Sequence, residues 1–148
     1  ASAYLKYKNS DIPEWEFIVE VANQTGCGLL LDLNNIFVNA RNFGFDPMVY
    51  LDHIPSHLIG QVHLAGFTDQ GTHYFDTHSK AVHNGVWALL QRLAKRPEWA
   101  SLPHVPVMIE WDEDIPTFPE LEAELGKARQ IWTSARSTQK ENPVMELQ

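Results

Sequence analysis

The sequence predicts an α/β fold with about three to four parallel strands, arranged as in part of a (β/α)8 barrel. Segments with apolar residues at helical spacing alternate with short continuous apolar runs, which are typical of strands covered on both faces. The connections between successive runs are long enough to hold a helix, and such crossovers join parallel strands. Half of a barrel and a small open sheet both satisfy this pattern, so it leaves the two open.

The first helix is predicted to begin after Ser10, with Asp11 as its capping residue and Pro13 in its first turn. Its buried face is expected to carry the apolar residues at helical spacing, which are Trp15, Ile18, Val19 and Ala22. Gly26 is placed to end this helix. The apolar run at residues 28–32 then predicts the first strand.

The rest of the chain continues the alternation. In order, it predicts a helix at 46–54, a strand at 59–64, a long polar segment at 65–82, a helix capped by Asn84, a strand at 106–110 and a helix at 118–136. The polar segment is too long for a simple connection, which indicates a functional or structured loop. Residues 1–136 are therefore expected to form the barrel part, and residues 137–148 a loose polar tail.

Composition and charge exclude several classes of protein. The net charge of −8, without a cluster of Lys and Arg, argues against binding to nucleic acid or to an anionic membrane surface. No apolar run approaches the roughly 20 residues that span a bilayer. The one cysteine, Cys27, has no internal disulfide partner, so we expect a reducing, cytoplasmic setting. No glycine-rich phosphate-binding motif follows any predicted strand.

Polar residues lie at the ends of the three predicted strands, which are Asp32, His63 and Glu110. Because the carboxyl ends of barrel strands converge on one face, these side chains are expected to lie close together. Such a mixed nitrogen and oxygen set suits iron, manganese or catalytic zinc. The alternatives are structural: Asp32 forms an Asx-turn and His63 is a hydrogen-bonded core histidine. Glu110 fits such a role less well, because an unpaired buried carboxylate is costly.

The long polar segment adds a second set of ligand side chains. Asp76 and His78 are two residues apart, and so lie on the same side if that stretch is extended. Asn35 follows Asp32 in the same strand-end loop and is within reach of the same place. The alternatives are a solvated loop pair for Asp76 and His78, and a turn residue for Asn35.

Five ordered motifs resemble those of the UPF0276 (DUF692) family. They are Gly-Cys-Gly-Leu-Leu-Leu-Asp-Leu-Asn-Asn-Ile, Gly-Phe-Asp-Pro, Val-His-Leu-Ala-Gly, Asp-Thr-His and Ile-Glu-Trp-Asp-Glu-Asp-Ile-Pro, and they fall within residues 1–116. The family is similar to the multinuclear iron-dependent oxidases, which modify cysteine or nearby residues of ribosomally made peptides, as in methanobactin biosynthesis. The resemblance implies a xylose-isomerase-like TIM barrel with two or three iron ions, a ribosomal precursor peptide as substrate and a partner protein that presents it.

Matched position by position, the resemblance implies that the metal ligands are Asp32, Asn35, His63, Asp76, His78 and Glu110. The family's earlier ligands, two histidines and a glutamate, have no counterpart here, and a TIM barrel typically needs ~250 residues. We therefore expect the C-terminal half of a barrel, inactive alone and prone to self-association through its uncovered edges. A zinc or manganese hydrolase or isomerase on the same barrel, and a non-catalytic half-barrel, are the alternatives.

Overall fold

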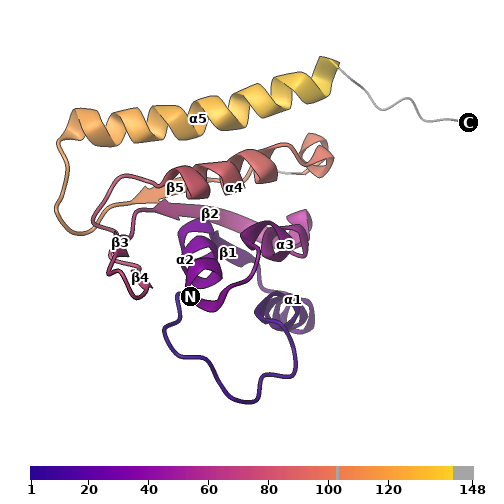
Figure 1. Ribbon diagram of the computed structural model, residues 1–148. Coiled ribbons are helices and arrows are strands. Elements are labelled where there is room, and N and C mark those ends of the chain that lie inside the picture. Colours follow the sequence, from indigo (N-terminus) through magenta and orange to yellow (C-terminus); the bar gives the residue numbers. More distant parts are fainter. Residues whose placement is uncertain (103, 142–148) are drawn as a thin grey trace, which may run out of the picture.

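The computed structural model describes residues 1–102 and 104–141, and their centre is a parallel sheet of three strands (Figure 1). The strands are β1 (Leu29–Asp32), β2 (Ile59–Ala65) and β5 (Val107–Glu110), in the order β1-β2-β5. Both pairs are parallel, with Asp32 opposite His63 and Ala65 opposite Glu110. The α/β prediction with parallel strands is therefore confirmed, and the sheet fits part of a barrel-like fold.

Helices connect the strands and supply the core. They are α1 (Glu14–Thr25), α2 (Leu33–Phe43), α3 (Pro47–Asp52), α4 (Asn84–Ala94) and α5 (Phe118–Glu141), with short 3-10 turns at Ser56–Leu58 and Pro97–Ala100. One apolar cluster joins the strands to α2, α3 and α4, and the apolar face predicted for α1 packs against it. The buried stripe of α4, with Val86 and Leu90 fully enclosed, confirms the helical spacing of the sequence.

Each strand presents one side to this core and the other away from it. Leu31, Val62 and Leu64 are at most 3% exposed, whereas Leu30 is 54% and Met108 is 37% exposed. The side chains of a strand alternate between the two faces of the sheet. The sheet therefore has one covered face, which packs on the helices, and one open face.

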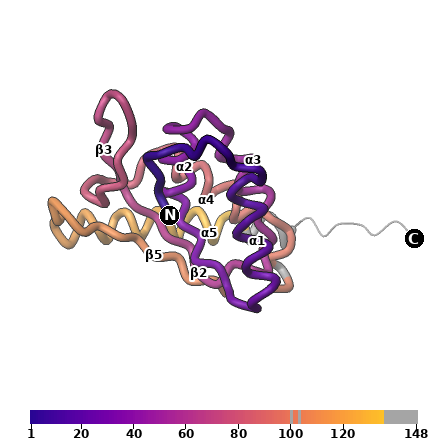
Figure 2. The backbone as a smooth tube through the Cα atoms, turned by 90° about the horizontal axis from the view of Figure 1, so that it is seen from below, coloured from indigo at the N-terminus to yellow at the C-terminus, as the bar shows by residue number. Residues whose placement is uncertain are grey.

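A small hairpin lies between β2 and α4. Its strands are β3 (Thr68–Asp69) and β4 (Tyr74–Phe75), which pair antiparallel. The tube view shows this segment projecting from the rest of the chain (Figure 2). The expectation that residues 65–82 are structured in their own right is confirmed.

Helix α2 is absent from the sequence-based prediction, which placed a loop after Asp32. The helix begins directly at the strand end, because the Asp32 side chain accepts a hydrogen bond from the backbone N–H of Asn35. Its four asparagines disfavour a helix by propensity, but two of them, Asn34 and Asn39, are buried with its apolar residues. Gly44, in the left-handed conformation, ends it.

Other helix boundaries also need correction. Helix α1 begins at Glu14 with no side-chain cap, so the prediction of Asp11 as the cap is wrong. Helix α4 is capped by His83, whose Nδ1 accepts from the N–H of Gly85. Helix α5 extends to Glu141, because no glycine or proline interrupts the sequence after Gly126 until Pro143. Part of the predicted tail is thus helical, and residues 142–148 lie outside the described residues.

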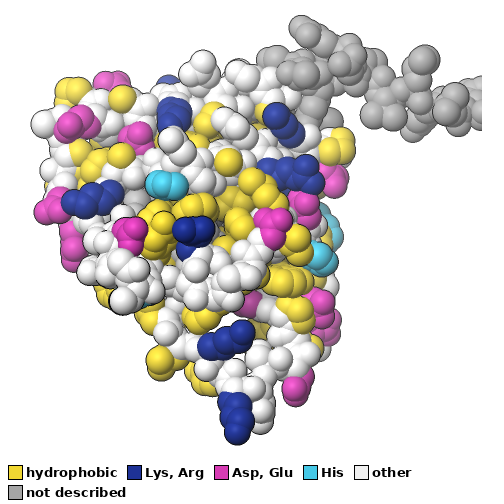
Figure 3. All heavy atoms as spheres, in the orientation of Figure 1, with side chains coloured by type: hydrophobic (Ala, Val, Ile, Leu, Met, Phe, Trp, Pro, Cys, Tyr) yellow, Lys and Arg dark blue, Asp and Glu magenta, His cyan; other side chains and the backbone are white. Residues whose placement is uncertain are grey.

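The surface carries charges of both signs. On the face in Figure 3, Lys and Arg side chains are scattered among Asp and Glu rather than gathered into one patch. Within the described ranges, every helix is too short or too polar to cross a membrane.

Candidate metal centre

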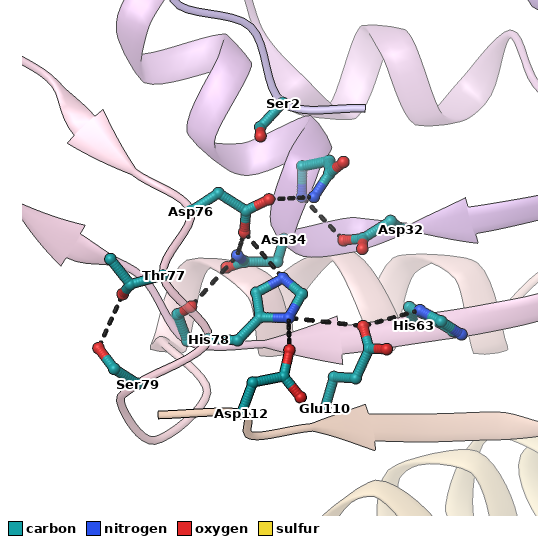
Figure 4. Close-up of polar contacts among 12 residues, drawn as sticks. Ser2, Asp32, Asn34, His63, Asp76, Thr77, His78, Ser79, Glu110 and Asp112 are labelled. Carbon is teal, nitrogen blue, oxygen red and sulfur yellow. Dashed lines mark hydrogen bonds and ion pairs between the residues drawn. The ribbon is translucent and has the colours of Figure 1, made fainter. Parts of the chain in front are cut away.

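Three predicted ligands meet at the carboxyl end of the sheet (Figure 4). Asp32, His63 and Glu110 come from β1, β2 and β5, and each offers one ligand atom within 4.8 Å of the others. The parallel arrangement produces this meeting, since neighbouring parallel strands end at the same edge of the sheet. The expectation that these side chains lie close together is confirmed.

Asp32 caps helix α2 with one oxygen, and its buried carboxylate has a raised pKa. One carboxylate oxygen, Oδ1, accepts from the N–H of Asn35 at 2.9 Å, so the structural interpretation is confirmed for that oxygen. Within the described residues the second oxygen has no hydrogen bond. Burial raises the pKa of Asp32 despite the Asn35 hydrogen bond, and the negative charge of Asp76 raises it further. A cation beside Asp32 would relieve this cost.

His63 is 7% exposed and contacts the triad through one nitrogen. Its Nδ1 lies 3.3 Å from Oε2 of Glu110. Its Nε2 is buried and has no hydrogen-bond partner among the described residues. Leaving a buried polar atom without a partner is costly, so His63 is not a fully satisfied core histidine. Its Nδ1 faces Glu110, and the mixed donor set of the triad fits a metal ion.

A second group of side chains is centred on Asp76. The side-chain amides of Asn34 and Asn35 donate to its two oxygens, Oδ1 at 2.6 Å and Oδ2 at 2.8 Å. Both asparagines lie in the first turn of α2, so the helix that Asp32 caps also holds Asp76 in place. Asn35 thus lies beside Asp76, and its role as a ligand stays a prediction.

His78 connects the two groups. Its Nε2 lies 3.1 Å from Oδ1 of Asp76, and its Nδ1 lies 3.5 Å from Oε2 of Glu110 and 3.1 Å from Oδ2 of Asp112. Burial alone would lower the pKa of His78, but the charges of Asp76 and its other carboxylate neighbours outweigh it and raise the pKa above its usual value. The interpretation of Asp76 and His78 as a solvated loop pair is wrong, since their side chains are only 10% and 16% exposed.

The loop that carries Asp76 and His78 is tied down at Gly66. Its carbonyl oxygen accepts from the N–H of His78 at 3.1 Å and from the Asn34 amide at 3.4 Å. A Cβ on Gly66 would lie 2.0 Å from the carbonyl oxygen of Lys80, so the backbone packs here without room for a side chain. The hydroxyls of Thr68, Thr77 and Ser79 hydrogen-bond one another beside it.

Sequence reasoning missed two members of the cluster, Asn34 and Asp112. Asn34 is fully buried and contacts Asp76 directly. Its signal was the Asn-Asn pair, of which only the second member was selected. Asp112 follows Glu110 by two residues, a spacing that puts both side chains on one side of an extended chain.

The charges of the cluster favour a cation. Four carboxylates, from Asp32, Asp76, Glu110 and Asp112, surround two histidines. Carboxylate oxygen and imidazole nitrogen are the donors of iron, manganese and catalytic zinc sites. The residues therefore fit a metal ion, and a multiply charged ion would offset the repulsion among the carboxylates.

Comparison with known proteins supplies the family. The family described as "RiPP precursor modification enzyme MbnB/TglH/ChrH" matches residues 1–133. A UPF0276 protein of Anaeromyxobacter sp. (strain Fw109-5) is 41% identical over 134 residues, which are 90% of this chain and 46% of the relative. One of Acaryochloris marina is 44% identical over 127 residues, 86% of this chain and 44% of the relative.

A third relative, a UPF0276 protein of Vibrio parahaemolyticus, is 45% identical over 147 residues, 94% of this chain and 49% of its own length. The chain thus spans about half the length of the curated relatives it matches. The family match covers most of the chain and includes all six predicted ligand positions. This chain therefore belongs to the MbnB/TglH/ChrH family of RiPP precursor modification enzymes, as the UPF0276 resemblance implied.

Proposed function

We propose that this chain carries part of the iron centre of an oxidoreductase that modifies cysteine, or a residue near it, in a ribosomally made precursor peptide. The observation that carries this proposal is the convergence of Asp32, His63 and Glu110 at the end of the sheet. The family description supports a peptide substrate, because its members act on RiPP precursors. The donor set supports a metal, and the resemblance to iron-dependent oxidases favours iron over other ions that such donors accept.

The proposed ligands divide into two groups. Asp32, His63 and Glu110 form the first, while Asn35, Asp76 and His78 form the second. His78 lies between the groups, within 3.5 Å of Glu110, so two or three ions in neighbouring positions are compatible with this spacing. The carboxylates would neutralise the ions and His63 would donate from its buried ring.

Bound iron would transfer electrons from the peptide to dioxygen, which takes up protons and leaves as water. The chain's own residues position this chemistry. The rigid strand ends fix the three ligands of the first group, and the paired amides of Asn34 and Asn35 hold Asp76. The exposed open face beside Leu30 and Met108 leaves the centre accessible from that side of the sheet.

We further propose that the centre is completed by the rest of a xylose-isomerase-like barrel. The relatives are about twice as long as the matched region, and the open face of the sheet is the side that the interior of a closed barrel would enclose. In this proposal residues 1–136 form the barrel part, and a partner protein presents the precursor peptide. Self-association of this chain is the alternative way to cover the open face.

The proposal is tested by elemental analysis of the protein purified without oxygen. We expect stoichiometric iron that is lost in His63→Ala and kept in His57→Ala, since His57 is exposed and lies before the amino end of β2, the end opposite to the proposed ligands. Zinc or manganese in place of iron, with hydrolytic rather than oxygen-dependent activity on peptide, would favour the hydrolase or isomerase alternative. Absence of metal from both proteins, with unchanged stability, would favour a non-catalytic half-barrel.

A further inference from the structure

We propose that Asp112 is a positioning residue for His78: it accepts the proton on Nδ1 and so turns Nε2 toward the cation that Asp76 also faces. This inference rests on the proposed metal function, but its central claim concerns a proton position that exists without metal. Asp112 lies two residues after the end of β5 and is not among the predicted ligands.

The two nitrogens of His78 face different carboxylates. Nε2 lies 3.1 Å from Oδ1 of Asp76, on the side of the first turn of α2, whereas Nδ1 lies 3.1 Å from Oδ2 of Asp112 (Figure 4). A neutral imidazole carries one ring proton, so only one nitrogen can donate while the other binds a cation. The geometry therefore offers two tautomers, and the surroundings decide between them.

Glu110 is the competing acceptor for Nδ1. Its Oε2 lies 3.5 Å from Nδ1 of His78, farther than Asp112, and the same oxygen lies 3.3 Å from Nδ1 of His63. Because Glu110 also belongs to the triad, a bound cation would engage its carboxylate. Asp112, whose side chain is 64% exposed, is then the acceptor left for His78.

The backbone holds Asp112 in this position. His78 has a φ of 50°, an unusual conformation for a residue with a side chain. Its carbonyl oxygen accepts from the N–H of Asp112 at 2.8 Å and from that of Glu113 at 3.4 Å. Asp112 thus contacts both the main chain and the ring of His78, and these two contacts fix the ring relative to Asp76. Strained backbone is often kept where a side chain must be aimed.

A carboxylate behind a metal-binding histidine has a known effect. It fixes the tautomer and makes the ligand more basic, and its removal typically lowers metal affinity about 10- to 100-fold. Because Asp112 is largely exposed, we expect an effect of about tenfold.

The first test measures the tautomer in metal-free protein labelled with 15N-histidine. Two-bond proton–nitrogen correlations, recorded above the pH at which the imidazolium loses its proton, show which nitrogen is protonated, and a His78→Gln variant assigns the signals. We expect the proton on Nδ1 in the parent protein and in Asp112→Asn, whose amide oxygen still accepts. Asp112→Ala should shift it toward Nε2, while Glu113→Ala, a neighbouring exposed carboxylate, should not. A proton on Nε2 in the parent, or no shift in Asp112→Ala, overturns the inference.

The second test measures affinity for Fe²⁺ by anaerobic competition with a chromogenic chelator. Asp112→Ala should weaken binding by about tenfold, with Asp112→Asn and Glu113→Ala close to the parent. Equal affinity of all four proteins overturns the effect of Asp112 on the metal. If none of them binds iron, the proposed function fails for this chain, and the tautomer measurement still decides whether Asp112 orients His78.

Discussion

The two faces of the sheet use the same three strands for different purposes. On the covered face, Leu31, Val62 and Leu64 are buried in the apolar cluster that the sheet shares with the helices. On the open face, Leu30 and Met108 are exposed. His63, toward the carboxyl end of the same face, is nevertheless buried.

The difference shows how the alternation of a strand separates stability from chemistry. Successive residues of β2 point to opposite faces, so His63 and Leu64 are neighbours in sequence with opposite surroundings. The covered face stabilises the fold by burying apolar area. The open face holds charged and polar groups whose mutual repulsion is not offset by packing. Substitutions on the two faces should therefore have distinct consequences.

The largest effect on stability is expected on the covered face. Leu64→Ala removes a fully buried side chain and should lower the free energy of unfolding by about 2–5 kcal/mol. The matched control is Leu30→Ala on the open face, where a half-exposed leucine should cost less than about 1 kcal/mol. Urea denaturation of metal-free protein measures both. Equal losses in the two variants would show that the open face is covered in solution, as self-association would cause.

The largest effect on metal binding is expected at His63, the residue before Leu64. His63→Ala should weaken Fe²⁺ binding by more than the roughly 10- to 100-fold that outer-shell partners cost, because it removes a proposed ligand. The unfolding free energy of the metal-free variant should fall much less than that of Leu64→Ala, since the Nε2 atom of His63 has no partner to lose among the described residues. Isothermal titration without oxygen and urea denaturation check the two parts. A His63→Ala variant that loses as much stability as Leu64→Ala but binds iron as the parent does would contradict the assignment of metal binding to the open face.

Metal uptake by the open-face cluster should weaken as the pH falls. Burial raises the pKa of Asp32, and the carboxylates around His78 raise its pKa, so protons compete with metal at higher pH than for ordinary side chains. Each competing proton weakens binding by up to about tenfold per pH unit below the pKa concerned. Iron titrations across the acidic to neutral range measure the slope. Affinity that does not change with pH would argue against these two residues as ligands.

The smallest effect concerns the free-energy cost of keeping the buried Asp32 carboxylate ionised in metal-free protein. A pKa raised in the folded state means that folding favours the protonated form, so this contribution to stability is present below the unfolded pKa and lost as the pH rises through the folded pKa. Asp32→Asn keeps the cap of α2 and removes the charge. At neutral pH it should stabilise metal-free protein by on the order of 0.5 kcal/mol.

That gain should shrink as the pH is lowered, because the parent protein then protonates Asp32 as well. Thermal unfolding of both proteins with a chelator present, at neutral and acidic pH, measures the difference. A variant less stable than its parent at neutral pH would mean that the Asp32 charge is already compensated without metal.

The sequence predicts the sheet well because its strands are short apolar runs with helix-length connections. The convergence of Asp32, His63 and Glu110 follows from that pattern, since parallel strands end at one edge. Their closeness in space could therefore be predicted from the strand ends alone. Asn35, Asp76 and His78 were candidates from their places in the loops, and their proposed ligand roles rest on the family resemblance.

What the sequence did not predict depends on tertiary contacts. Helix α2 contains asparagines that disfavour a helix locally, and it forms because its apolar face and two of those asparagines are buried. The role of Asn34 follows from its contact with Asp76, which is 42 residues away in the chain. Asp112 has the same character: its contact with His78 spans 34 residues and depends on an unusual backbone conformation.

Gly66 has no reactive side chain, and its role too depends on tertiary contacts. Its carbonyl oxygen is shared by the backbone of His78 and the side chain of Asn34, and the main chain at Lys80 lies too close for any Cβ. Even Gly66→Ala must move the main chain at Gly66 or at Lys80, and this movement would change the positions of Asp76 and His78. If the proposed ligands bind metal, a search for variants that lose metal would therefore find Gly66 among them, and mutational intolerance alone would misidentify Gly66 as a ligand.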